Sequence, residues 1–347
     1  MALRSRTHLV LSTSPNTQDM SKRRLSKQQQ RRVNEQRRLT KPDDIAAVEV
    51  CNGRVISHFG QQLEVEALPV GSEQDTIRCH QRANLPALVT GDLVQWEPGE
   101  DGLGVVNAVA ERRNVFLRPD AQGRASKDKP VAANLDVVLV VIACVPEPFV
   151  NLIDRYLVAI ENLGLRAALV LNKTDLLESG DKALAEMMAI YKNLAYPVFE
   201  VSAKNGSGID SLTSFLEGLT TVLVGQSGVG KSSLVNCLAE SDDALVGDLS
   251  VGKEKGTHTT TTARLFHLPH CDLVDSPGIR EFSLGLLAAD QICQGFPELR
   301  ELAGQCKFRN CSHQEDPGCA LVAAAQAGDI EPKRWASFQQ IIASAVE

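Results

Sequence analysis

The pattern of apolar and polar positions divides the chain into regions of different character. Residues 46–112 hold about five short β-rich stretches, some with apolar side chains at every second position. Glycines separate these stretches, as at Gly60, Gly71, Gly91 and Gly102. Short alternating strands with glycine turns predict a small β-barrel. The OB-fold is the first choice, and an SH3-like barrel would give much the same pattern.

From about residue 134, continuous apolar stretches alternate with helical spacing. The segment 136–145, DVVLVVIACV, predicts a buried strand, and the helical pattern after it ends at Gly164. Repetition of this rhythm predicts an α/β domain with a parallel sheet covered by helices. After about residue 291 the pattern becomes mostly helical. The expected parts are a basic arm at 1–45, the barrel at 46–112, an α/β domain at 113–290 and a helical module at 291–347.

The charge is distributed unevenly. The whole chain carries a formal net charge of −7, yet residues 1–41 contain eleven Lys and Arg against two acidic residues. This arm has too few apolar residues to fold alone and is expected to be disordered until it meets a polyanion. A solubilising tail is the alternative. Met20 opens the basic stretch, and the role of residues 1–19 stays open.

The remaining composition favours a cytoplasmic protein. No apolar run approaches the roughly 18 residues of a membrane helix, and the N-terminus lacks a secretory signal. Nine cysteines are an odd number, which argues against a disulfide framework. Six scattered cysteines are expected to be small buried thiols: Cys51, Cys79, Cys144, Cys237, Cys271 and Cys293.

The segment GQSGVGKSS matches the phosphate-binding loop pattern G-x-x-x-x-G-K-[ST]. An apolar strand precedes it and a helix follows, so backbone N–H groups and the helix N-terminus would face phosphates. Lys231 should reach the β- and γ-phosphates, and the Ser232 hydroxyl should bind Mg²⁺. The candidate phosphate-binding residues are Gly225, Gln226, Ser227, Gly228, Val229, Gly230, Lys231, Ser232 and Ser233.

Two earlier motifs indicate guanine. The run Asn172, Lys173, Thr174 and Asp175 ends an apolar strand and resembles the guanine-reading motif of Ras-like GTPases. The Asp175 carboxylate can accept from the ring N–H and the exocyclic amine of guanine, whereas adenine lacks that donor pair. An ATPase is therefore disfavoured.

The run Ser202, Ala203 and Lys204 resembles the short motif that closes over the guanine O6.

Two later segments fit the part of the site that would contact Mg²⁺ and the γ-phosphate. Asp275 and Gly278 belong to the sequence DSPG after an apolar strand, where Asp275 would hold Mg²⁺ through water and the Gly278 N–H would sense the γ-phosphate. The stretch GTHTTTT, residues 256–262, has the place of the first switch loop. Either Thr259 or Thr260 should close on Mg²⁺, and the sequence does not choose between them.

Three cysteines and a histidine form a candidate zinc site. Cys306, Cys311, His313 and Cys319 lie within fourteen residues. Four soft ligands suit a closed tetrahedral Zn²⁺ site, which is typical of a structural metal. Such a metal would stabilise a module whose own core is small.

The order of the motifs is permuted, because the guanine motifs precede the phosphate loop, the threonine-rich loop and DSPG. This order resembles the circularly permuted GTPases. Together with the barrel and the C-x₄-C-x-H-x₅-C module, it resembles the RsgA family of bacterial GTPases from about Met20 onward. The resemblance implies GTP hydrolysis in late maturation of the small (30S) ribosomal subunit, with binding to its rRNA through the barrel and the zinc module. A monomer is expected.

The permutation and one missing residue refine the expected mechanism. The segment after DSPG leads directly into the C-terminal module, so hydrolysis could move that module. Ile279 stands where Ras-like enzymes place a water-orienting Gln. By hypothesis His258 positions the water once the ribosome orders its loop; the alternative is a loop residue facing rRNA or solvent.

Other functions remain as alternatives. A guanine-nucleotide-dependent ribosome-binding clamp with little hydrolysis is the main one, although Lys231, Ser232 and Asp275 complete a magnesium set. A translational or tRNA-modifying GTPase is disfavoured by the motif order. The maturation event, the rRNA contacts and the oligomeric state are not determined by the sequence.

Overall fold

The structure is a computed structural model that describes residues 51–59, 62–69, 76–99, 102–118, 129–177, 182–239, 263–275, 287–309, 311–314 and 316–346. The basic arm, the threonine-rich loop with His258, Thr259 and Thr260, and Gly278 lie outside these residues. All the described residues belong to one compact unit.

The predicted barrel is confirmed. Each strand pairs with its neighbours in the order β1-β2-β3-β5-β4, and β4 closes the ring on β1. The β3–β5 pair is parallel and the other pairs are antiparallel. This Greek-key order is that of the OB-fold. The strands are β1 (Gly53–Phe59), β2 (Gln62–Ala67), β3 (Thr76–Gln81), β4 (Leu93–Pro98) and β5 (Gly104–Val109).

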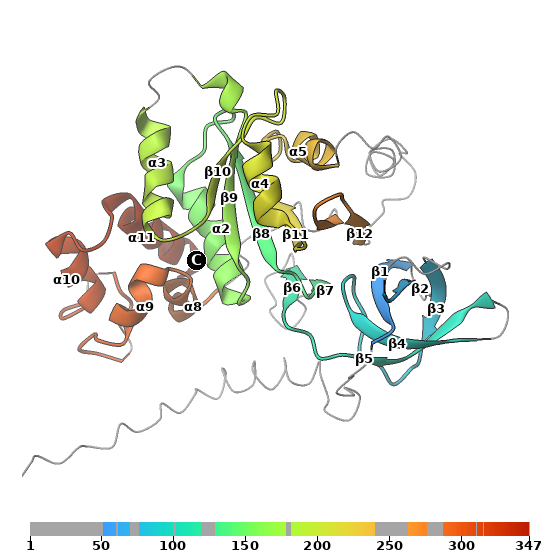
Figure 1. Cartoon of the computed structure of the whole chain (residues 1–347). Coiled ribbons are helices and arrows are strands. Elements are labelled where there is room, and N and C mark those ends of the chain that lie inside the picture. Colours follow the sequence, from blue (N-terminus) through green and yellow to red (C-terminus); the bar gives the residue numbers. More distant parts are fainter. Residues whose placement is uncertain are drawn as a thin grey trace, which may run out of the picture. The chain divides into compact units, whose positions relative to one another are not determined.

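The α/β domain contains the predicted parallel sheet (Figure 1). Its strand order is β10-β9-β8-β11-β13-β12, with only β12 antiparallel to its neighbour among these described strands. The strands are β8 (Val137–Ala143), β9 (Ala167–Asn172), β10 (Val198–Glu200), β11 (Thr220–Val224), β12 (Arg264–His267) and β13 (Asp272–Asp275).

Helices cover both faces of this sheet, and the central strand shows why. Val138, Val140 and Ile142 of β8 share one core with α2 and α3, while Leu139 and Val141 share another with α4 and α5. Because successive side chains of a strand point to opposite faces, a continuous apolar strand requires cover on both. The helices are α2 (Val150–Asn162), α3 (Lys182–Asn193), α4 (Ile209–Leu216) and α5 (Lys231–Leu238).

Two features between the barrel and the sheet were not predicted. A hairpin of β6 (Val115–Arg118) and β7 (Lys129–Ala133) leads from the barrel to β8. The edge strand β12 also pairs with β1 through one residue pair, Ser57 with Arg264. The barrel is thus continuous in hydrogen bonding with the nucleotide-domain sheet.

The C-terminal region is helical, as predicted. It comprises α8 (Ala289–Gln294), α9 (Pro297–Ala303), α10 (Ala320–Ala327) and α11 (Pro332–Val346). Phe296, Phe338 and Ile341 belong to the same buried cluster as Ile153 and Leu157 of α2. These helices therefore extend the core of the α/β domain rather than form a separate one.

Candidate nucleotide and metal sites

The predicted nucleotide motifs meet at one edge of the sheet. The guanine motif follows β9, the SAK motif follows β10, the phosphate loop follows β11, and Asp275 ends β13. These strands are parallel, so their carboxyl ends share one edge (Figure 1). Ligands of open α/β sheets bind at that edge.

Asn172 joins three motifs. It is 1% exposed, and its Nδ2 donates a 3.0 Å hydrogen bond to the Val229 carbonyl of the phosphate loop. Its Oδ1 accepts a 3.1 Å bond from the Ala203 N–H of the SAK motif. A buried amide with both ends bonded fixes the relative positions of the loops that contact base and phosphate.

Lys173 spans the gap between the guanine motif and the phosphate loop. Its Nζ donates to the Gly228 carbonyl at 2.6 Å and to the Val145 carbonyl at 2.8 Å. Cys144 and Val145, which directly follow β8, were not among the predicted site residues. Cys144 is half-buried, and its thiol donates to the Lys173 carbonyl at 3.0 Å. Their position directly after a buried strand is the signal that could have identified them.

Asp175 is held in its charged form. Its Oδ1 accepts a 2.6 Å hydrogen bond from the Ser202 hydroxyl, and Lys204 Nζ lies 3.6 Å from its Oδ2. The Ser202 hydrogen bond, with a further contribution from Lys204, lowers the pKa of the Asp175 carboxyl. An ionised carboxylate with acceptor capacity left is suited to the paired donors of guanine.

The phosphate loop has the expected backbone. Gly230 has φ +91°, and a Cβ there would stand 2.5 Å from Asn172 Nδ2, so a side chain would break the contact between loop and guanine motif. Lys231 begins α5 and its Nζ donates to the carbonyls of Gly225 and Gln226 at 2.6 and 2.7 Å. Ser232 and Ser233 lie in the first turn of α5.

Of the residues predicted to contact Mg²⁺, or the γ-phosphate through the switch segments, the structure describes Ser232 and Asp275. Asp275 is half-buried at the end of β13, opposite Arg264 of β12 in the strand register. The other predicted groups, His258, Thr259, Thr260 and Gly278, fall outside the described residues.

The four predicted metal ligands come together. One ligand atom from each of Cys306, Cys311, His313 and Cys319 lies within 4.8 Å of the others. The Sγ atoms of Cys306 and Cys319 are 3.9 Å apart, and His313 Nδ1 lies 3.6 and 3.7 Å from them. Zinc–sulfur bonds of about 2.3 Å in a tetrahedron separate sulfurs by about 3.8 Å. The cluster therefore fits Zn²⁺.

Asp316 supports the four metal-ligand residues and was not predicted from the sequence. Its Oδ2 accepts from the Ser312 N–H at 2.6 Å and from the Ser312 hydroxyl at 2.5 Å, and it lies 3.5 Å from Cys311 Sγ. Such outer contacts orient ligands. Gln339 of α11 also donates to the His313 carbonyl at 2.8 Å, which ties the cluster to the last helix.

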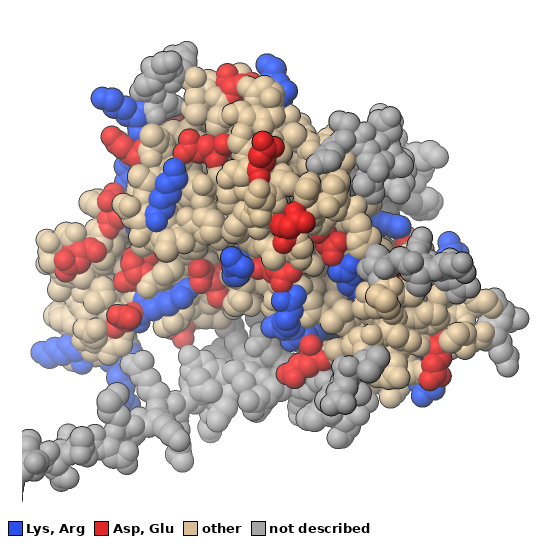
Figure 2. Space-filling view, in the orientation of Figure 1, with Lys and Arg blue, Asp and Glu red and all other residues tan. Residues whose placement is uncertain are grey.

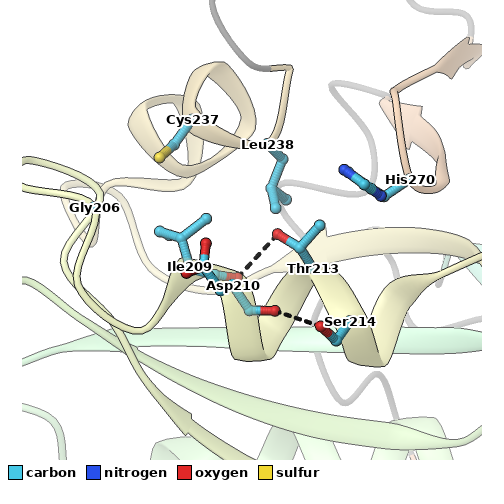
Figure 3. Close-up of a pocket in the computed structure, with 8 residues that line it drawn as sticks. All are labelled: Gly206, Ile209, Asp210, Thr213, Ser214, Cys237, Leu238 and His270. Carbon is cyan, nitrogen blue, oxygen red and sulfur yellow. Dashed lines mark hydrogen bonds between the residues drawn. The ribbon is translucent and has the colours of Figure 1, made fainter.

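A hollow of about 390 Å³ lies elsewhere, between α4 and the end of α5 (Figure 3). Thr213 and Ser214 on its wall turn their hydroxyls back to carbonyls of their own helix. Its lining includes none of the predicted nucleotide-binding residues, so this hollow is separate from the nucleotide site.

Comparison with known proteins decides the family. The family model described as RsgA GTPase matches residues 109–285. A small ribosomal subunit biogenesis GTPase RsgA of Pseudomonas aeruginosa (strain LESB58) is 52% identical over 297 residues, covering 85% of this chain and 86% of the relative. The RsgA of Azotobacter vinelandii is 53% identical over 298 residues, with the same coverage.

The chain belongs to the RsgA GTPase family. It is thus a GTP-hydrolysing enzyme, and family membership implies a guanine nucleotide with Mg²⁺. The resemblance inferred from the motifs is confirmed.

Solved structures agree with the fold. YjeQ from Thermotoga maritima matches with a TM-score of 0.67 and 30% identity, covering 85% of this chain and 98% of that one. YloQ, described as a circularly permuted GTPase, has a TM-score of 0.66 and 24% identity over 84% of this chain and 94% of its own, which supports the fold alone. Among the described residues, no helix has the length and apolarity needed to cross a membrane.

Proposed function

We propose that this GTPase acts in late maturation of the small ribosomal subunit, binds its rRNA and is stimulated by it. The names of the relatives at 52–53% identity support this role. The observation that carries the nucleotide assignment is the bonding of Asn172 to both the phosphate loop and the SAK motif, beside an ionised Asp175. A cytoplasmic monomer is sufficient for this function.

The roles of the nucleotide-site residues follow from their positions. Asp175 would select guanine, Ser202, Ala203 and Lys204 would close over the base, and Lys231 would exchange its loop carbonyls for phosphate oxygens. Ser232 and Asp275 would hold Mg²⁺, which when bound neutralises charge on the β- and γ-phosphates. Thr259 or Thr260 and the Gly278 N–H would respond to the γ-phosphate.

We further propose that His258 positions the attacking water when the small subunit orders its loop. The absence of a Gln after DSPG, where Ile279 stands, supports this role. His258→Ala should leave the affinity for GTP near that of the unchanged protein and remove most of the stimulation. Full stimulated turnover in this variant would refute the role of His258 without affecting the family assignment.

The Cys306, Cys311, His313 and Cys319 cluster is proposed to hold one structural Zn²⁺. All four groups are protein ligands, so no coordination position is left open for substrate. The distances between sulfurs and imidazole nitrogen support this assignment. Metal analysis of the purified protein should give one zinc per chain.

The four-part division of the chain, with a basic arm, barrel, nucleotide domain and zinc-binding region, is retained as a proposal. The arm would contact rRNA phosphates, so removal of residues 1–41 should reduce the salt dependence of subunit binding.

The deciding experiment is GTP hydrolysis with and without purified small subunits. Large subunits serve as the control for nonspecific ribosome effects, and excess ATP tests nucleotide choice. Stimulation by small subunits alone, with no ATP competition, is expected. Turnover that ignores small subunits would refute the assembly role, and tight binding to them without turnover would favour the guanine-nucleotide clamp.

A further inference from the structure

A short loop between two metal ligands exposes an aromatic side chain between two basic ones. Lys307, Phe308 and Arg309 are consecutive, and all three are exposed. Phe308 is 48% exposed, one of five large apolar side chains that stand out in the described part of the chain. A phenyl ring that is about half exposed forgoes part of the stabilisation that full burial would give. An exposed ring on an anchored loop therefore suggests a partner.

The start of the loop is anchored by contacts of Lys307. Cys306 and Cys311 belong to the metal cluster, and the Lys307 N–H donates to the Gly318 carbonyl at 3.1 Å. Gly318 has φ +77°, and a Cβ there would lie only 3.0 Å from the Lys307 Cβ, so the stem of Lys307 packs directly on this glycine. The Lys307 ammonium then lies 5.4 Å from the centre of the Phe308 ring. Ring and charge are therefore presented together on an anchored backbone, which lowers the ordering cost of binding.

The chemistry of the three side chains selects a partner. Two cations match a chain of phosphates, and a free aromatic face matches an unstacked base, which is how proteins recognise single-stranded RNA. The basic residues could also serve only to offset the charge of the thiolates, but that purpose would not require an exposed phenyl ring between them.

The charge pattern of one face of the protein is consistent with a local contact. On the face shown in Figure 2, basic and acidic side chains are interspersed and do not form one field of a single sign. A broad electrostatic footprint is therefore not visible on that face. Three adjacent residues that combine charge with stacking can provide affinity without a broad positively charged surface.

We propose that Phe308 stacks on an unpaired rRNA base of the small subunit while Lys307 and Arg309 contact the flanking phosphates. This inference rests on the proposed function, because it places one contact of the same ribosomal partner. It assigns to the metal cluster the task of presenting this loop.

Substitutions separate stacking from charge. Phe308→Leu keeps apolar bulk but cannot stack, and should weaken binding of purified small subunits by about 5- to 150-fold, the equivalent of one lost base–aromatic stack. Phe308→Tyr should bind like the unchanged protein. Lys307→Gln and Arg309→Gln should each reduce the slope of log affinity against log salt by about 1, whereas Phe308→Leu should leave that slope unchanged.

Matched controls exclude general effects. Phe149→Ala removes a phenyl ring that is 52% exposed but has no basic neighbours in sequence, and should not change binding. Lys333→Gln removes an exposed charge of the same region, and should not change the salt slope in the way that Lys307→Gln does. Zinc content and basal GTP hydrolysis should be unchanged in all Phe308 variants, and a loss of zinc in Lys307→Gln alone would assign that lysine to charge compensation.

A photo-cross-linker identifies the partner directly. With p-benzoylphenylalanine at position 308, irradiation of the complex should give a product that ribonuclease degrades. A product sensitive only to protease would show a ribosomal protein at this site and overturn the proposal, as would equal binding by Phe308→Leu and Phe308→Tyr. If the unchanged protein neither binds nor responds to small subunits, the proposed function itself fails, which is a distinguishable result.

Discussion

Arg334 provides the sharpest test of how the C-terminal helices are attached. Its side chain is 1% exposed in α11 and forms ion pairs with Asp154 of α2, which is fully buried, and with Glu298 of α9 at 2.7 Å. Its guanidinium also lies 4.3 Å from the centre of the Phe296 ring. Arg334→Met keeps much of the volume but leaves Asp154 without its cation. Breaking one partner of a buried pair costs about 3–5 kcal/mol of unfolding free energy.

The cost should depend on the remaining charge and not on the lost volume. Asp154→Asn in the Arg334→Met background removes that charge, and the Asn carbonyl can still accept from the Tyr191 hydroxyl, which now lies 2.8 Å from Asp154 Oδ1. Most of the lost stability should therefore return in the double variant. Lys192→Met breaks the exposed Lys192–Glu200 pair and should cost less than about 1 kcal/mol.

Denaturant unfolding of the zinc-loaded protein measures these differences. The fluorescence of Trp335, whose ring packs on Phe338 in α11, reports on the helices concerned. If Arg334→Met cost no more than Lys192→Met, or if the double variant were no more stable than the single one, the view that a buried charge cluster fastens α11 to α2 would be refuted.

Three further outcomes are expected. Asp175→Asn should replace a carboxylate acceptor by an amide that can donate, so nucleotide competition should show weaker binding of GTP and relatively stronger binding of xanthosine triphosphate. A hydrogen bond to Asp272 raises the pKa of His267, so its stabilising charge is complete below about pH 6.5 and is lost as the pH rises through the higher folded-state pKa; His267→Gln should lower stability at about pH 6 and flatten the decline toward alkaline pH in denaturation curves. Chelation of zinc, or Cys319→Ser, should lower the melting temperature of the helical region while GTP binding persists, as followed by helical circular dichroism and nucleotide fluorescence.

Local patterns predicted most of the fold, for identifiable reasons. The continuous apolar strand β8 needs cover on both faces, and short strands separated by glycine turns are typical of a small barrel or sandwich. The β6–β7 hairpin and the pairing of β12 with β1 were missed. The β12–β1 pairing joins segments far apart in sequence, Ser57 with Arg264, which no local period reports. The hairpin is a local feature, but its strands are short and show no clear alternation.

The candidate sites divide in the same way. The sequence predicted the residues that contact a ligand directly, because only a few residue types can bind zinc or phosphate. The four metal ligands and the phosphate-loop residues are examples. The sequence did not predict the residues that support the sites. Cys144, Val145 and Asp316 act through a thiol, a backbone carbonyl and a carboxylate, groups whose role depends only on their position in the fold. Of the six cysteines expected to be buried, Cys79, Cys271 and Cys293 are, while Cys51, Cys144 and Cys237 are only half-buried.

The barrel and the C-terminal helices are attached to the nucleotide domain in different ways. This difference changes which of them is expected to move when the nucleotide state changes. The strands β12 and β13, which follow the threonine-rich loop in sequence, contact the barrel through ion pairs and through the backbone pairing of β12 with β1. Arg54 of β1 pairs with Asp272 at 2.7 Å, and Arg264 pairs with Glu64 of β2 at 2.9 Å.

Ile56 of β1 also lies in the same buried cluster as Leu265 and Val274 of these strands. The C-terminal helices share a larger part of this apolar core with α2, to which Phe296, Phe338 and Ile341 contribute. Among the described residues of the barrel strands, only Ile56 belongs to the apolar cluster that joins the C-terminal helices to α2.

Separating a packed core exposes apolar surface at about 25 cal/mol per Å², so the junction with the larger shared core costs more to open. The permuted connection after Asp275 suggested that hydrolysis would move the C-terminal module. Energetically, the barrel junction is the softer of the two, and it is joined to the same strands. A change in the loops around the γ-phosphate should therefore reposition the barrel before it displaces the helices.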